Sequence, residues 1–161
     1  MASVDYFLKI DGIPGESQDA QHKGEIQILS FNFGEQQAGS MADNGGGGCG
    51  KVQMQDFTFT MNVNKASPKL FLTCATGDHI GKAVLTARKA GEDQQDYLKI
   101  TLSDVLVSSY QTSGDTRGSL PVESISLNFA AIEVEYKPQN DDGSLGAASK
   151  VKYNLKEMTS K

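Results

Sequence analysis

The chain has 161 residues, of which 38% are hydrophobic and 22% charged, and its formal net charge is −5 at pH 7. This length and composition are typical of a single globular domain, here residues 1–161, which can bury a core without disulfides or a metal. Binding to nucleic acid needs clustered cations, whereas the 15 Lys and Arg residues are scattered along the chain. The sequence therefore argues against nucleic acid as a partner.

The N-terminal segment does not have the pattern of a targeting sequence. A secretory signal needs a basic region and then an unbroken apolar stretch, and Lys9 and Asp11 interrupt the apolar residues here. A membrane-spanning helix needs about 18 apolar residues in a row, which no part of the chain approaches. We therefore expect synthesis in the cytoplasm, no signal peptide and no stable membrane insertion.

Apolar and polar residues alternate along most of the chain, which is typical of half-buried β-strands. In the last of these strands, lysines alternate with apolar residues, as in edge strands that resist aggregation. The polar stretches 16–24 and 138–149 are predicted to be loops, the second of them mobile. In chain order, we predict strands over residues 6–10, 25–33, 51–63, 83–88, 97–110, 124–136 and 150–157.

One segment has helical rather than strand periodicity. Ser67 is predicted to be the N-cap, Pro68 occupies the first helical position, and Gly77 supplies a left-handed C-terminal cap. The sequence thus predicts one short helix over about 68–76 that packs against the sheet. Its apolar face is predicted to contain Leu70, Phe71 and Cys74.

The apolar phase shifts by one residue partway along four of the long strands. In one of them Ile100 and Leu102 give way to Val105 and Val107. Such a shift moves the apolar residues to the other face, so each strand either carries a bulge or serves two different buried surfaces. The pattern favours a closed β-barrel of two packed antiparallel sheets. Either part of its apolar surface is reserved for another subunit, or the shifts are ordinary bulges at barrel corners.

A run of glycines from Gly45 to Gly48 lies within a long Gly-rich loop over about 37–50. With Gly50 and Lys51 it fits the first part of a phosphate-binding loop, but Val52 stands where that motif needs Ser or Thr. A strand pattern also follows, instead of the helix whose N-terminus would face the phosphate. The run indicates instead a pliable backbone, or one that closely approaches another surface.

The sequence contains no arrangement of residues typical of an enzyme or a metal site. The histidines and cysteines have no paired spacing, and there is no nucleophile elbow. Glu133 and Glu135 are expected on the solvent side of a strand, and Cys74 is expected to be an inert core thiol. We predict no catalytic, cofactor-binding or metal-binding residues. His22 and His79 are interpreted as ordinary loop residues. A non-enzymatic β-domain that self-assembles fits these observations best.

Several short segments, taken together and in order, resemble those of a known protein family. They read DYFLKI over 5–10, GES over 15–17, GSM over 39–41, GGGGCGKVQMQD over 45–56, RKAG over 88–91, YLKITL over 97–102, VLVSS over 105–109 and LNFA over 127–130. In this order, over essentially the whole chain, they resemble the haemolysin-coregulated protein (Hcp) family.

The resemblance implies a β-barrel with one flanking helix that forms homohexameric rings. The rings would stack into the inner tube of the type VI secretion system, capped by a spike protein (VgrG) and surrounded by a contractile sheath. The tube would carry effector proteins in its lumen and would itself be secreted into the medium or a target cell. The alternative from the residues alone is a monomeric, non-catalytic β-sandwich that binds a ligand.

The resemblance also assigns residues to contacts. The loop over 37–50 would contact neighbouring subunits or the next ring. Asn32 would face the channel and touch cargo, since it alternates with Phe31 and Phe33. Cys49 is expected to be exposed in isolated rings and protected in stacked tubes. The predicted subunit or ring contacts are Gly45, Gly46, Gly47, Gly48, Cys49, Gly50, Lys51, Gly91 and Glu92.

Overall fold

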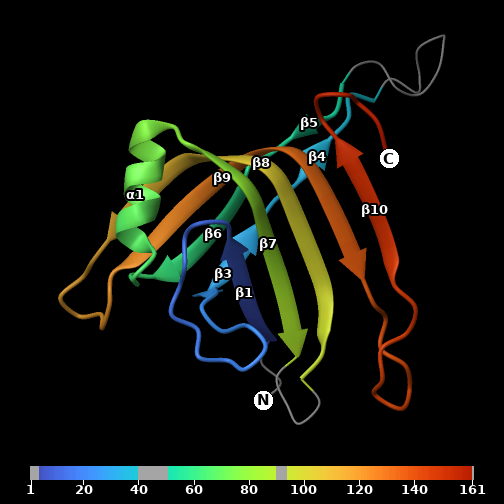
Figure 1. The fold of residues 1–161 in the computed structure, drawn as a ribbon, viewed down its shortest axis with the longest axis horizontal. Coiled ribbons are helices and arrows are strands. Elements are labelled where there is room, and N and C mark those ends of the chain that lie inside the picture. The colour runs from blue at the N-terminus through green and yellow to red at the C-terminus, as the bar shows by residue number, and fades with distance from the viewer. Residues whose placement is uncertain (1–3, 40–50, 90–93, 161) are drawn as a thin grey trace.

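The computed structural model describes residues 4–39, 51–89 and 94–160, and these residues form a mainly β fold with one α-helix (Figure 1). The elements are β1 (Val4–Ile10), β2 (Ile26–Ile28), β3 (Ser30–Asn32), β4 (Glu35–Gln36), β5 (Gln53–Met54), β6 (Phe57–Asn62), α1 (Ser67–Thr76), β7 (His79–Lys89), β8 (Asp96–Ser113), β9 (Val122–Tyr136) and β10 (Ser149–Asn154).

Eight of the strands form one antiparallel sheet that curls into a nearly closed barrel. The strand order is β2-β1-β7-β8-β9-β6-β3, with β10 paired to β9. Strands β2 and β3 lie at opposite ends of this order, yet only Leu29 separates them in the chain. The Leu29 amide donates to the carbonyl of Thr60 on β6 at 2.8 Å, which helps to close the barrel. The predicted barrel is confirmed, although a single curled sheet forms it.

Strand β9 has two neighbours along one of its edges. Residues 122–127 pair with β6, and residues 131–136 pair with β10, while the other edge pairs with β8 along its length. The strand predicted over 150–157 ends at Asn154, and among the described strands it pairs with β9 alone. The prediction that it is an edge strand is therefore confirmed.

The phase shift in β8 is a local irregularity within one core. It occurs at Asp104, whose φ of +52° is rare for a residue other than glycine. Ile100 and Leu102 before it, and Val105 and Val107 after it, belong to the same hydrophobic cluster. In the predicted strands 25–33 and 51–63, the strand itself is interrupted, at Leu29 and at residues 55–56. Both halves of β8 thus serve one core, and the register with β9 is unchanged across Asp104; the register shift in this pairing lies further on, between Val107 and Ser109.

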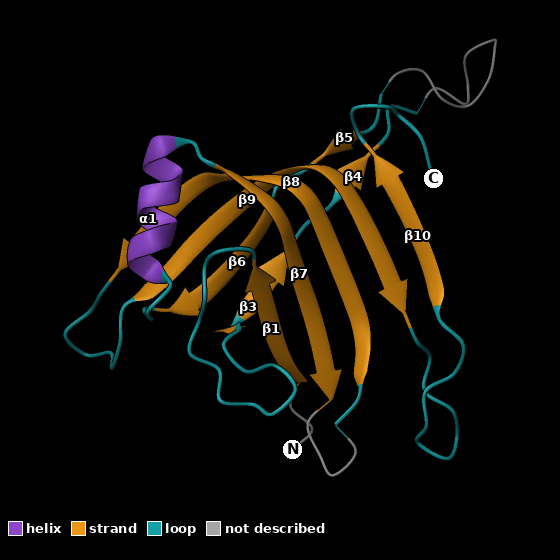
Figure 2. Cartoon of the chain, viewed as in Figure 1, coloured by secondary structure: helices purple, strands orange, loops and turns teal. Residues whose placement is uncertain are grey.

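Helix α1 flanks the barrel (Figure 2) and begins one residue earlier than predicted. Ala66 is its N-cap residue, so the prediction that Ser67 caps the helix is wrong. The Ser67 hydroxyl instead donates to Glu123 and accepts the amide of Asn64 at 3.0 Å. The predicted cap at Gly77 is confirmed, with a φ of +71° and an N–H bond to the carbonyl of Thr73 at 3.0 Å.

Only part of the predicted apolar face of α1 is buried. Leu70 is fully buried and Cys74 is partly buried against the core. Phe71 is 58% exposed, although its ring contacts the edge of Tyr110 at a centroid distance of 5.9 Å. The expectation that Phe71 belongs to the buried face is wrong, because residues four apart share a helix face whereas adjacent residues point about 100° apart.

Candidate functional site

The predicted contact loop connects the strands of a small ribbon at one end of the barrel. Strands β4 and β5 pair through Glu35 with Met54 and Gln36 with Gln53. The end of β7 at Lys89 and the start of β8 at Asp96 lie at the opposite end (Figure 1). Lys51 is described and exposed. The remaining predicted contacts lie outside the described residues, namely Gly45, Gly46, Gly47, Gly48, Cys49, Gly50, Gly91 and Glu92.

Asn32 lies on β3 with its side chain exposed, as alternation predicts. The neighbouring Phe31 is half-buried and stacks on Phe57, with ring centroids 5.7 Å apart. Phe33 also packs against the core. The outward orientation of Asn32 is therefore confirmed, and its contact with cargo in a channel stays a prediction.

An uncovered apolar surface lies where the barrel wall is open beside β10. Val151 is 68% exposed, and Tyr136 and Met158 are also exposed. Beside Val151 is a pocket of about 240 Å³. The pocket is lined mainly by apolar side chains, including Phe33, Met54, Ile132, Val134 and Tyr153. We call Val151, Tyr136, Met158 and the residues that line this pocket the β10 surface. The alternation of lysines along β10 predicted an edge strand but did not locate this apolar surface.

A second apolar surface lies on α1, on the opposite side of the barrel (Figure 2). Phe71 and Leu72 are 58% and 57% exposed. Leu120, in the connection between β8 and β9, and Val122, at the start of β9, are exposed as well. We call Phe71 and Leu72 the α1 surface. The molecule thus presents two different apolar surfaces to solvent, on opposite sides.

Glu123 anchors α1 from inside the barrel. Its carboxylate is buried and accepts hydrogen bonds from the hydroxyls of Ser67 and Tyr110. Burial and the contact with this carboxylate raise the pKa of Tyr110 to about 12. The tyrosine therefore remains a donor over the physiological pH range. We call Glu123, Ser67 and Tyr110 the helix anchor.

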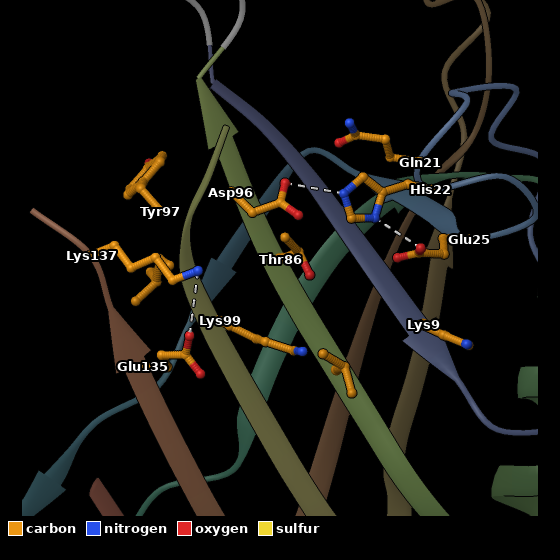
Figure 3. Close-up of a pocket in the computed structure, with 12 residues that line it drawn as sticks. Lys9, Gln21, His22, Glu25, Thr86, Asp96, Tyr97, Lys99, Glu135 and Lys137 are labelled. Carbon is orange, nitrogen blue, oxygen red and sulfur yellow. Dashed lines mark hydrogen bonds and ion pairs between the residues drawn. The ribbon is translucent and has the colours of Figure 1, made fainter. Parts of the chain in front are cut away.

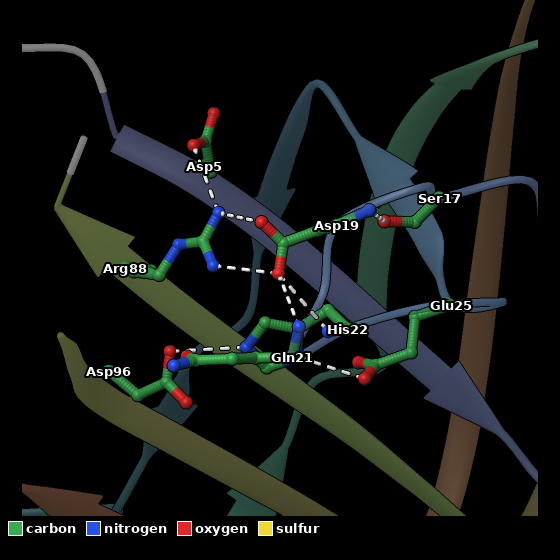
Figure 4. A network of polar contacts seen from close by, with 8 residues as sticks. All are labelled: Asp5, Ser17, Asp19, Gln21, His22, Glu25, Arg88 and Asp96. Carbon is green, nitrogen blue, oxygen red and sulfur yellow. Dashed lines mark hydrogen bonds and ion pairs between the residues drawn. The ribbon is translucent and has the colours of Figure 1, made fainter. Parts of the chain in front are cut away.

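A charged network holds the loop over residues 11–25 against the outer face of the sheet (Figure 4). The buried guanidinium of Arg88 on β7 donates to both carboxylate oxygens of Asp19, at 2.9 and 2.6 Å, and lies 3.7 Å from Asp5 on β1. It also lies over the ring of Phe7, 4.9 Å from its centroid. The hydrogen bonds from Arg88 hold the pKa of Asp19 well below its usual range.

His22 forms the other half of this network. Its Nδ1 lies 2.8 Å from Glu25, its Nε2 lies 3.1 Å from Asp96 at the start of β8, and its ring stacks on Phe7 at 4.5 Å. Burial lowers the pKa of His22, but the hydrogen bonds to the two carboxylates outweigh it and raise the pKa above the ordinary value. The interpretation of His22 as an ordinary loop residue is wrong, since it is only 6% exposed. We call Asp5, Asp19, His22, Glu25, Arg88 and Asp96 the loop network.

A groove of about 330 Å³ lies beside His22, between this loop and strands β7, β8 and β9 (Figure 3). Lys9, Lys99 and Lys137 contribute cations to it, and Lys137 lies 3.9 Å from Glu135. Both nitrogens of His22 are engaged by carboxylates, so the ring has no free nitrogen to act as a general base. The described residues contain no group of three or more side chains that could hold a metal ion.

The chain matches known proteins along most of its length. The family model for the type VI secretion system effector Hcp matches residues 7–136. Protein hcp1 of Pseudomonas aeruginosa is 45% identical over 157 residues, which cover 96% of this chain and 97% of that protein. The chain belongs to the Hcp family.

Solved structures of Hcp proteins share the fold. The crystal structure of Hcp1 from Salmonella typhimurium matches with a TM-score of 0.82 and 34% identity, covering 100% of both chains. A structure described as a type six secretion system protein matches with a TM-score of 0.93 and 30% identity, over 99% of this chain and 100% of that one. The chain is therefore a type VI secretion protein by family and by fold, as the resemblance implied.

The length of the helix in this Hcp-family chain can be compared with that of a membrane span. In the described ranges, none of the helical structure is both long and apolar enough to span a bilayer; α1 has 10 residues.

Proposed function

We propose that this Hcp-family protein is a non-enzymatic structural component of the type VI secretion system. It forms hexameric rings that stack into the inner tube, carries effector proteins in the lumen and, after synthesis in the cytoplasm, is itself secreted by the type VI route. The spike protein (VgrG) and the contractile sheath are its partners. The observation that carries the proposal is the pair of different apolar surfaces on opposite sides of one barrel.

Two different surfaces favour a head-to-tail contact between subunits. A two-fold dimer brings the same surface of each subunit together, whereas a heterologous contact joins unlike surfaces and closes into a ring when the rotation allows it. Burying the α1 surface of one subunit against the β10 surface of the next removes apolar area from water, which contributes about 25 cal/mol per Å². This single contact would bury both apolar surfaces.

Stacking of one ring on the next would use the two ends of the barrel, which the contact between subunits within a ring leaves free. The β4–β5 ribbon lies at one end of the barrel, and the end of β7 and the start of β8 lie at the other, roughly across the line that joins α1 and β10 (Figure 1). Contacts from residues 45–51 and from Gly91 and Glu92 would then join one ring to the next. Cys49 labelling tests this, because equal labelling in isolated rings and stacked tubes contradicts the assignment.

The lumen assignment depends on Asn32. Its exposed amide on β3 can donate and accept hydrogen bonds, as a residue that touches varied cargo must. Asn32→Asp adds a charge at this position and should change the binding of lumen cargo, measured by co-purification with rings. Unchanged binding of every cargo would place Asn32 on another surface.

The deciding experiment is native mass spectrometry with negative-stain microscopy of the wild type, Val151→Asp and Phe71→Asp. Wild type should give a six-subunit mass and annular particles. Each variant has one disrupted surface and should lose the ring, whereas Gln18→Glu, which adds the same charge on the exposed loop, should keep it. A wild type that is monomeric at every concentration supports the ligand-binding alternative instead.

Mixing the two variants tests the head-to-tail contact directly. Val151→Asp keeps an intact α1 surface and Phe71→Asp keeps an intact β10 surface. An equimolar mixture should therefore form a mixed dimer with one good contact and no larger ring. A mixture that stays monomeric, or that restores rings, contradicts this pairing of surfaces.

A further inference from the structure

Backbone hydrogen bonds join the first and last segments of the loop over residues 11–25. The Gly15 amide donates to the carbonyl of Gly24 at 2.8 Å, and the Ser17 and Gly24 amides form two further bonds, to Glu25 and Ser17, at 3.0 and 2.9 Å. A Cβ atom on Gly15 would lie 2.5 Å from the Glu25 carbonyl oxygen, so the two backbone segments approach too closely for any side chain there. These bonds hold the first and last segments of the loop together.

Two side-chain ion pairs attach this loop to the barrel. Arg88 on β7 binds Asp19 in the first half of the loop, and Asp96 on β8 binds His22 in the second half (Figure 4). The geometry at His22 requires a particular protonation state. Each ring nitrogen faces a carboxylate oxygen, carboxylates only accept hydrogen bonds, and both nitrogens of an imidazole donate only when the ring carries its second proton.

We propose that His22 is a pH-sensitive switch within the loop network: its imidazolium holds the loop to the start of β8, and loss of its proton releases residues 20–25 from Asp96. The neutral ring can donate from one nitrogen only, so its other nitrogen then faces a carboxylate lone pair. This device belongs to the single subunit and goes beyond the proposed function, because it involves neither apolar surface.

The charges around His22 come from every element packed against it. The two bonded carboxylates are the nearest charges and favour the imidazolium, whereas the guanidinium on β7 opposes it and is itself neutralised by two aspartates. The lysines that line the groove also disfavour protonation of His22, from a greater distance. These groups are Asp19 and Glu25 of the loop, Asp5 and Lys9 of β1, Arg88 of β7, Asp96 and Lys99 of β8, Glu135 of β9, and Lys137 just after it.

The sign of the pH effect follows from the raised pKa of His22. A group whose pKa is raised in the folded state contributes stability that is fully present below its ordinary pKa and is lost as the pH rises through the raised value. The pKa of Asp19 is lowered and that of Arg88 is raised, so this pair stays charged over the same range. Release at rising pH is therefore confined to the second half of the loop.

The first test measures the pKa of both histidines in the assembled wild-type protein, by the slow exchange of the imidazole C2 proton read by mass spectrometry. His22 should titrate above the ordinary histidine value near 6.5. Asp96→Asn should lower the pKa of His22, because it removes an opposite charge within hydrogen-bond distance of the ring. A His22 that titrates at or below 6.5 in the wild type, or a pKa unchanged in Asp96→Asn, overturns the proposal.

The second test follows amide hydrogen exchange of residues 20–25, corrected for the intrinsic effect of pH. Exchange in the wild type should rise about tenfold as the pH passes through the pKa of His22, because losing a hydrogen bond to a charged group corresponds to at least that factor. His22→Asn should exchange fast at every pH, and His79→Asn, at an exposed position on β7, should keep the wild-type profile. A wild-type profile that stays flat, or one that His22→Asn reproduces, also overturns the proposal.

Discussion

The helix anchor and the loop network each attach one segment to the barrel, with different chemistry. In the helix anchor, two hydroxyls donate to one buried carboxylate. In the loop network, a guanidinium and an imidazolium bind carboxylates that reach the surface. Because hydroxyls stay protonated at ordinary pH, we expect the helix contact to be indifferent to pH where the loop contact responds. Whether such an attachment depends on pH is therefore decided by the hydrogen-bond donor.

The largest effect is expected at the helix anchor. Glu123→Ala leaves the hydroxyls of Ser67 and Tyr110 without their acceptor and should lower the free energy of unfolding by about 4 kcal/mol, since each unpaired buried group costs roughly 1–3 kcal/mol. Urea denaturation at one fixed protein concentration measures this, because assembly also contributes to stability. Glu135→Ala, on the same strand but half-exposed, should change stability by less than about 0.5 kcal/mol. Equal losses for the two variants would mean that the anchor does not stabilise the fold.

Arg88→Met disrupts the loop network and should lower the free energy of unfolding by slightly less than Glu123→Ala does. It leaves Asp19 and Asp5 without their cation, and breaking a buried ion pair costs about 3 kcal/mol at the lower end of the known range. Arg117→Met removes an exposed pair with Asp115 of similar geometry and should have no measurable effect in the same urea experiment. If the two arginine variants are equally stable, burial does not strengthen the contact of Arg88.

Gly15→Ala tests whether stability depends on the close approach of the two backbone segments of the loop. The new Cβ would lie 2.5 Å from a backbone oxygen, so the loop must shift, and overpacking of this kind costs about 2 kcal/mol. At Gly118 a Cβ would meet its nearest atom at 3.5 Å, an ordinary contact, so Gly118→Ala is the matched control. Thermal denaturation compares the two variants. A Gly15→Ala protein as stable as Gly118→Ala would show that the loop tolerates rearrangement.

The smallest effect is confined to acid pH. Because the pKa of Asp19 is lowered in the folded state, its contribution is present above the ordinary aspartate pKa and is lost as the pH falls through the lowered value. The melting temperature of the wild type should therefore fall more steeply below about pH 4 than that of Asp19→Asn. Asp78→Asn, at an exposed position, should follow the wild type. Parallel curves for Asp19→Asn and the wild type would contradict the role of this ion pair.

Periodicity predicted the elements well because it depends on local residues. The edge strand, the cap at Gly77 and the outward side chain of Asn32 all followed from spacing along the chain. Glu123 also carried a signal, since it shares the odd-numbered positions of Ile125 and Leu127 and must face inward with them. A carboxylate in an inward position indicates a buried polar contact, and this inference was available from the sequence.

Other features depend on tertiary structure, which local spacing does not encode. His22 and Asp96 are 74 residues apart, and only the pairing of β1 with β7 and of β7 with β8 brings them together. The exposure of Phe71 depends on where the barrel wall meets the helix. The β10 surface results from the division of one edge of β9 between two partners, which no pattern within either partner strand reveals.

That division of the β9 edge has a consequence for how the protein opens. Because β6 and β10 pair with separate stretches of β9, residues 131–136 can lose their partner while the bonds of 122–127 remain intact. Strand β10 is thus a unit of local unfolding, with a free energy of opening below that of the whole barrel. Its departure would expose an unpaired strand edge that a β10 from another chain could fill, which makes this strand the natural element for domain swapping.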